Sequence, residues 1–248
     1  MPFMTHLIEL RRRLLYTITG FLVAFGISFH YAADIYDFLS HPLAQLMIEK
    51  GHENPRFIFT GLAEAFFTQI KLAMWMAMFL TFPLLASQVW LFVAPGLYKH
   101  EKRAFLPFLI ATPILFMAGA AMAYYMVFPM AWKFFLGFES MGGPNSMPIQ
   151  LEAKVNEYLS IVMGLTLAFG FCFLLPVLLV LLNRIGMVMA ETLAGGRRYA
   201  VVLILIVAAI LTPPDVISQL MLAVPIYILY EISIWLCYWQ EKSIGERP

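Results

Sequence analysis

Charged residues are scarce in this sequence. Only 12% of its 248 residues are Asp, Glu, Lys or Arg, whereas hydrophobic residues make up 62%. Soluble domains average roughly 25% charged and 45–50% apolar residues. So few charges are not enough to cover a water-exposed surface. We therefore exclude a soluble globular protein and predict a membrane protein.

Cysteine and catalytic motifs are also nearly absent. Cys172 and Cys237 lie in or beside apolar segments without metal or redox spacing, and the five histidines are scattered. The two cysteines are therefore expected to be small core residues. H-E-x-x-H, G-x-S-x-G and glycine-rich phosphate loops are missing. We expect no enzyme activity, no metal, no cofactor and no nucleic-acid partner.

The sequence contains several long runs without charged residues. A helical span needs about 20 such residues. We predict an all-α membrane protein, with a single polytopic domain over residues 1–248 and six transmembrane helices at approximately 14–33, 62–94, 104–132, 157–182, 199–213 and 216–236. Prolines within these spans predict a curved, kinked bundle; they are Pro83, Pro107, Pro113, Pro129, Pro176 and Pro225.

The basic residues predict the orientation of the bundle. If the N-terminus is cytoplasmic, eleven of the sixteen Lys and Arg residues fall on that side, which favours both termini inside. Residues 34–61 and 133–156 then form outer cap loops. In the first loop we expect Pro42 and Pro55 to interrupt regular structure, with a short interfacial helix in "PLAQLMIEK" between them.

The third span carries a run of small residues, which are Gly119, Ala120, Ala121 and Ala123. Small side chains let helix backbones approach closely in lipid. We expect this surface to pack against another helix of the same chain.

The last two spans are short. At 1.5 Å per residue the fifth span reaches about 24 Å, against a hydrocarbon core of about 30 Å. The short hairpin places Thr212, Asp215 and Gln219 close to lipid depth. Its inner end carries the aromatic residues Trp235, Tyr238 and Trp239, which are typical of a membrane interface.

Glu9 in "HLIELRRRLL" has two interpretations. It precedes Arg13 by four residues, the favoured order for an ion pair on one helix. Alternatively, Glu9 and Glu101, the only acid of "LYKHEKR", form a receptor for a cationic ligand, because carboxylates bind guanidinium groups strongly. Spacing alone leaves both interpretations open.

Three motifs together resemble one known family. "HLIELRRRLL", "FVAPGLYKHEKR" and "LTPPDVISQ" on six spans are similar to the TatC family, the receptor component of the twin-arginine protein translocase. The resemblance covers essentially the whole chain, including "FFTQIKL" and "AYYMVFPMAW". It implies export of folded proteins across the bacterial cytoplasmic (inner) membrane, driven by the proton gradient.

The resemblance also implies roles for particular residues. Glu9 and Glu101 match the acids that bind the paired arginines of a signal peptide. The family's motif arginine matches Arg11, and the loop aromatic residue matches Phe92. Four further residues share this patch by position: His6, Leu10, Pro95 and Lys99. Single-span TatA- and TatB-like partners, in a multimeric complex in membrane lipid, are expected to contact Thr212, Asp215 and Gln219.

One position departs from the family pattern. Many members carry a glutamate in the fourth span, two residues before a proline, where this chain has Leu174. A mechanism that needs a charge at mid-membrane is therefore in doubt. The main rival is a secondary transporter or channel for a small solute, which usually requires ionisable residues near the bilayer midplane. A second rival is a purely structural scaffold.

Overall fold

A computed structural model describes residues 3–52, 54–93, 102–140, 142, 147–212 and 216–245, with the backbone alone for 3–6, 92–93, 102–106, 217–218 and 243–245. Its elements in order are α1 (Phe3–His30), α2 (Ala32–Glu49), α3 (Glu64–Val93), α4 (Lys102–Met122), the π-helix η3 (Ala123–Val127), α5 (Phe128–Leu136), α6 (Val155–Cys172), α7 (Leu175–Arg184), α8 (Ala190–Gly195), α9 (Arg197–Leu211) and α10 (Val216–Gly245). Two isolated β-bridges are the only sheet-like pairing among the described residues. The predicted all-α class is confirmed.

Five helical segments of the described chain are long and apolar enough to cross a membrane. They are Leu7–His30, Glu64–Leu91, Pro107–Leu136, Val155–Arg184 and Gln219–Lys242. The apolar helix α9 has only 15 residues, which give about 22 Å, less than the thickness of about 30 Å of a hydrocarbon core. The chain is therefore a multi-pass membrane protein, and the sixth span stays a prediction.

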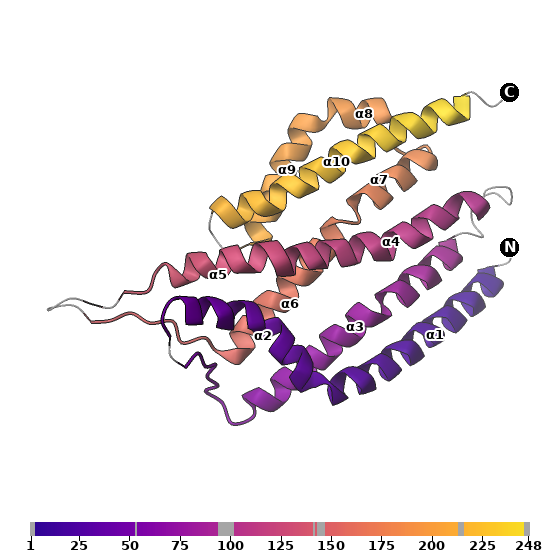
Figure 1. Cartoon of the computed structure of the whole chain (residues 1–248). Coiled ribbons are helices and arrows are strands. Elements are labelled where there is room, and N and C mark those ends of the chain that lie inside the picture. The colour runs from indigo at the N-terminus through magenta and orange to yellow at the C-terminus, as the bar shows by residue number, and fades with distance from the viewer. Residues whose placement is uncertain are drawn as a thin grey trace. The chain divides into compact units, whose positions relative to one another are not determined.

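The chain divides into two compact units. Unit 1 comprises Met1–Ile114 and Glu152–Met163, and unit 2 comprises Leu115–Leu151 and Gly164–Pro248. In unit 1, α1 and α3 lie side by side and antiparallel (Figure 1). The N-terminus of α1, the C-terminus of α3 and the start of α4 lie at one end of this unit, which we call the inner end.

The helix α2 is longer than the sequence indicated. The expected break at Pro42 is wrong, because Pro42 lies inside an 18-residue helix. One face of α2 is buried on both sides of the proline, at Leu39, Leu43, Leu46 and Met47. Burial of these side chains stabilises the helix by more than the loss of one backbone hydrogen bond costs.

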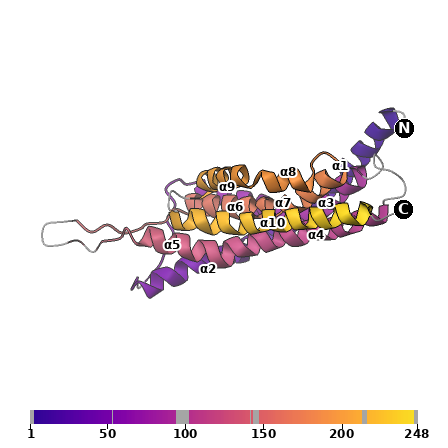
Figure 2. The same ribbon diagram turned by 90° about the horizontal axis from the view of Figure 1, so that it is seen from above.

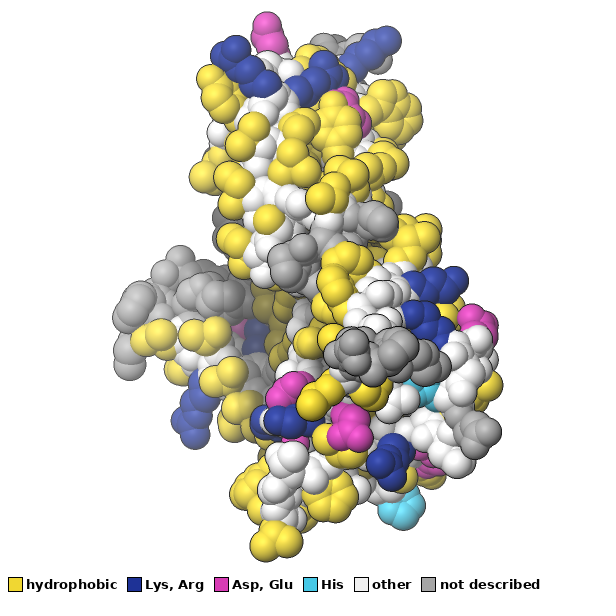
Figure 3. Space-filling view, turned by 90° about the vertical axis from the view of Figure 1, so that its left-hand side faces the viewer, with side chains coloured by type: hydrophobic (Ala, Val, Ile, Leu, Met, Phe, Trp, Pro, Cys, Tyr) yellow, Lys and Arg dark blue, Asp and Glu magenta, His cyan; other side chains and the backbone are white. Residues whose placement is uncertain are grey.

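The cap region of unit 1 is held by an aromatic cluster. The Tyr158 hydroxyl donates to the Leu39 carbonyl at 2.7 Å, and the Phe57 ring lies 4.9 Å from the Tyr158 ring and 5.8 Å from the Tyr36 ring. Burial, followed by the charge of Asp37, raises the pKa of Tyr36 to about 12. In Figure 3 charged side chains of both signs are spread over the lower part of the face turned to the viewer.

In unit 2 the small residue Gly119 of α4 packs against α6, as its sequence context predicted. A Cβ at Gly119 would clash with the Phe169 carbonyl and would lie 2.9 Å from Cγ of Phe173. A Cβ at Gly170 of α6 would in turn lie 2.6 Å from the Phe116 ring of α4. The two glycines therefore let α4 and α6 pack more closely than residues with a Cβ would allow.

Two of the prolines in the spans mark helix irregularities. Pro176 stands at the start of α7, directly after a two-residue turn that ends α6. Pro129 follows η3, a π-helix inside the third span. Since proline lacks a backbone N–H, it is tolerated in the first turn of a helical segment. Pro83, Pro107, Pro113 and Pro225 lie inside continuous helices, and the curved, kinked bundle stays a prediction.

The helix α10 packs against α7, α8 and α9 within unit 2 (Figures 1 and 2). It continues to Gly245, beyond the predicted end at residue 236. Glu241, in this extension, accepts from Asn183 Nδ2 at 2.6 Å and from the Ala190 N–H at 2.8 Å. These bonds attach the end of α10 to α7 and to the first residue of α8.

Candidate signal-peptide site and partner-binding hairpin

The inner end of unit 1 carries the predicted signal-peptide site, of which the structure describes a part. Glu9, Leu10 and Arg11 lie in the first turns of α1, where Leu10 is 44% exposed and Arg11 is also exposed. His6 and Phe92 lie in α1 and α3, with the backbone alone described. Pro95, Lys99 and Glu101 lie outside the described residues.

Glu9 forms the ion pair with Arg13 that their spacing indicated. Nε and Nη2 of Arg13 both donate to Oε1 of Glu9, the former at 3.1 Å. Arg13 also donates through Nη1 to the side-chain oxygen of Gln88 on α3, at 3.4 Å. Arg13 therefore links Glu9 to a neighbouring helix as well as neutralising it.

Gln88 is a residue that the motif analysis missed. It is a polar residue inside the long apolar run of α3, in "ASQVW". A polar side chain at such a position usually requires a partner within the protein. That signal was present in the sequence, but the identity of the partner was not.

Arg12 contacts a different side chain from those that Arg13 contacts. Its Nε and Nη2 each lie 3.2 Å from the Tyr16 hydroxyl, one helical turn further along α1, and the contact is exposed. Consecutive arginines therefore have separate partners, because adjacent positions on a helix face about 100° apart.

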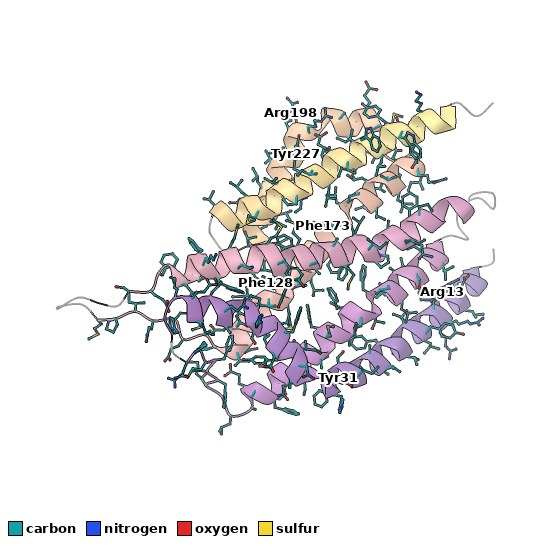
Figure 4. All side chains as sticks on the ribbon, in the orientation of Figure 1. Arg13, Tyr31, Phe128, Phe173, Arg198 and Tyr227 are labelled. Atoms are coloured by element: carbon teal, nitrogen blue, oxygen red, sulfur yellow. The ribbon has the colours of Figure 1, made fainter. Side chains whose placement is uncertain are left out.

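The inner end also brings together the segments that flank the undescribed loop. In Figure 1 the C-terminal end of α3, which carries Phe92, lies beside the N-terminal end of α1, which carries Glu9. The start of α4, which directly follows Glu101 in the chain, lies at the same end. Figure 4 shows Arg13 on α1 at this end.

The predicted polar cluster of the last hairpin lies in unit 2. The Thr212 hydroxyl is buried and donates to the Ala208 carbonyl at 2.8 Å. Gln219 Nε2 donates across the hairpin to the Leu205 carbonyl at 3.1 Å. Asp215 lies outside the described residues. Thr212 and Gln219 therefore both have hydrogen-bond partners within α9.

Leu174 lies at the interruption of the fourth span. Its N–H donates to the Phe171 carbonyl at 3.0 Å, and its own carbonyl accepts from the Leu178 N–H at 3.0 Å. Among the described residues, no group of three or more His, Cys, Asp and Glu side chains could hold a metal ion.

Comparison with known proteins identifies the family. The model of the family described as "Sec-independent protein translocase protein (TatC)" matches residues 5–225. The TatC protein of Magnetococcus marinus is 46% identical over 246 residues, covering 99% of this chain and 87% of the relative. That of Escherichia coli K12 is 42% identical over 234 residues, covering 94% and 87%.

A solved structure agrees with the sequence comparisons. A crystal structure of the twin-arginine translocase receptor TatC in DDM superimposes with a TM-score of 0.74 at 37% sequence identity, covering 94% of this chain and 99% of that chain. The match to the family model, the extended identity and the shared fold agree, and this chain belongs to the TatC family.

Proposed function

We propose that this chain is the receptor of a twin-arginine protein translocase, which binds the paired-arginine signal peptides of folded cargo. Its membership of the TatC family, whose solved member is described as the twin-arginine translocase receptor, supports this proposal. The chain acts as a transport component, and we propose no catalytic step for it.

The observation that carries the proposed site is the geometry of Glu9. Both hydrogen bonds from Arg13 go to Oε1, and the Glu9 side chain is 29% exposed. Among the described residues, Oε2 of Glu9 therefore has no hydrogen-bond donor. A carboxylate held by one oxygen can accept an incoming guanidinium with the other.

The remaining residues of the proposed site have complementary roles. Glu101 supplies the second carboxylate, so that each arginine of the signal has an acid. Phe92 and Leu10 contact the apolar part of the signal. Arg11 and Lys99 limit nonspecific binding of cations, because they repel isolated positive charges. His6 and Pro95 complete the patch.

We propose that the hairpin of α9 and α10 recruits the single-span partners TatA and TatB. Ile206 and Ile210 of α9 are 55% and 77% exposed, which leaves an apolar face for another helix. The proposed contact residues are Thr212, Asp215 and Gln219. The proposal rests on this exposed face and the family, because Thr212 and Gln219 already have internal hydrogen bonds.

The proposed topology follows the distribution of basic residues. Both termini lie in the cytoplasm, and the chain lies in the bacterial inner membrane, within a multimeric complex. The proton gradient supplies the energy, since each charge that crosses the membrane contributes about 2.3 kcal/mol per 100 mV.

Photo-crosslinking tests the receptor proposal. A signal peptide with a photoreactive residue next to its arginine pair is added to the purified full chain, and the adducts are mapped by peptide sequencing. We expect adducts in the first turns of α1 and in the segment 92–101. Adducts spread evenly over the apolar helices would contradict a defined site and would favour nonspecific partition into the detergent micelle.

A further inference from the structure

Two adjacent arginines at the start of α9 have different partners. Arg197 binds Glu231 through two bonds, Nε to Oε1 at 2.8 Å and Nη2 to Oε2 at 3.0 Å. The Tyr227 hydroxyl donates to the same carboxylate at 2.9 Å. Glu231 therefore neutralises Arg197, and the pair ties α9 to α10 within unit 2.

Arg198 is not neutralised in this way. Its guanidinium carbon lies 4.8 Å from the centre of the Tyr199 ring, and Nη2 donates to the Tyr199 hydroxyl at 3.1 Å. Among the described residues, no carboxylate forms an ion pair with it. Figure 4 shows Arg198 where α8 meets α9, on the surface turned away from the other helices. A full positive charge is thus held at this surface by an aromatic ring.

The Arg197–Glu231 pair places the first turn of α9, which carries Arg198 and Tyr199, beside the turn of α10 that precedes Trp235. Tyr199, Trp235 and Trp239 are each 67% exposed. Trp235 and Trp239 follow Glu231 by four and eight residues, which is about one and two turns further along α10. We call Arg198, Tyr199, Trp235 and Trp239 the arginine–tryptophan patch. In Figure 3 basic side chains, with acidic ones beside them, lie at the upper edge of the molecule, above hydrophobic ones.

The patch borders a surface that faces lipid. The next turn of α9 exposes Val202 and Leu203 at 56% and 62%. In a multi-pass membrane protein such apolar side chains contact hydrocarbon. Tryptophan and tyrosine prefer the level of the lipid headgroups, where one end of the ring is apolar and the other is wet. The patch therefore lies where the hydrocarbon contact ends.

We propose that the arginine–tryptophan patch binds the headgroup of an anionic phospholipid. The guanidinium of Arg198 offers planar donors to phosphate oxygens, and the two indole N–H groups can donate to the headgroup or ester oxygens. A net negative headgroup satisfies the charge of Arg198, whereas a zwitterionic one brings its own cation. This inference rests on membership of a membrane-protein family and does not depend on the proposed receptor function.

Lipid retention by the purified full chain tests this inference. The protein is equilibrated in micelles containing equal amounts of phosphatidylglycerol and phosphatidylcholine with the same acyl chains, and bound lipid is identified by native mass spectrometry. We expect wild type to retain phosphatidylglycerol preferentially. Because one arginine near a membrane contributes about 1 kcal/mol, Arg198→Gln should lower this preference about fivefold.

Arg56→Gln is the matched control. Arg56 is also exposed, but it lies in the cap region near Glu152, with 3.9 Å between Nη2 and Oε1, and its replacement should leave the preference unchanged. Arg198→Lys keeps the charge without the planar group and should give a lipid preference between those of wild type and Arg198→Gln. This variant replaces Arg198→Gln as the test if the glutamine variant does not fold. Equal retention of both lipids by wild type would overturn the inference, as would an unchanged preference in Arg198→Gln. Displacement of the lipid by millimolar inorganic phosphate would also overturn it, because the site would then bind free phosphate.

Discussion

Arg13 binds one carboxylate oxygen of Glu9, four residues earlier on α1, and leaves the other oxygen without a donor among the described residues. The ion pair and the receptor site were alternative interpretations of the same glutamate. This geometry makes them compatible, because the pair fixes the position of the carboxylate while Oε2 stays available. Arg13 in turn is fixed by Gln88 of α3.

The first prediction concerns Arg13→Ala. Removal of the guanidinium leaves Glu9 unpaired and breaks the link from α1 to α3, so we expect a loss of stability of about 1 kcal/mol. Thermal unfolding in detergent measures the change. Arg12→Ala is the control, because among the described residues Arg12 contacts only Tyr16, on its own helix and in an exposed position. Equal effects of the two substitutions would contradict a linking role for Arg13.

The second prediction concerns the signal itself. A lysine pair offers two point charges where two carboxylates favour planar groups with several donors. We expect a twin-lysine peptide to bind at least tenfold more weakly than a twin-arginine peptide, which corresponds to about 1.4 kcal/mol. Fluorescence anisotropy of the labelled peptides measures this ratio. Equal affinities would show that the site recognises charge alone.

The third prediction concerns the approach of α4 to α6. Gly119→Ala places a methyl group against the Phe169 carbonyl and the Phe173 ring, and overpacking of this kind costs about 1–3 kcal/mol. Gly164→Ala on α6 is the control, because a Cβ there meets nothing within 4 Å. The unfolding midpoint should fall in the first variant and stay the same or rise in the second.

The fourth prediction concerns pH. The pKa of Tyr36 is raised from 10.0 to about 12, so the folded state keeps this proton at pH values where the unfolded chain has lost it. The contribution of Tyr36 is fully present below pH 10 and is lost as the pH rises toward 12. Tyr36→Phe keeps the ring beside Phe57 and should lose less stability than wild type over this window. Parallel curves of unfolding midpoint against pH would contradict the burial of Tyr36.

Local rules predicted much of this fold. Long uncharged runs indicated the apolar helices, and the spacing of Glu9 and Arg13 indicated their ion pair. Each of these features depends on residues that are close together in the sequence.

The features that the sequence did not predict depend on distant contacts. The helix α2 continues through Pro42 because its buried face packs against the rest of unit 1. The helix α10 continues to Gly245, where Glu241 bonds residues more than fifty positions away. The partner of Gln88 was likewise invisible, because it lies seventy-five residues earlier. The motif residues on 94–101 were assigned by resemblance, and the role of Glu101 stays a prediction.

The most direct test of the receptor account is the affinity of a labelled twin-arginine signal peptide for the purified full chain and its acid variants. We expect Glu9→Ala and Glu101→Ala each to weaken binding at least tenfold, or about 1.4 kcal/mol. Glu49→Ala, which removes an exposed acid at the end of α2, should bind like wild type. Equal affinity of all four proteins would contradict the account, and Glu9 would then serve only as the helix partner of Arg13.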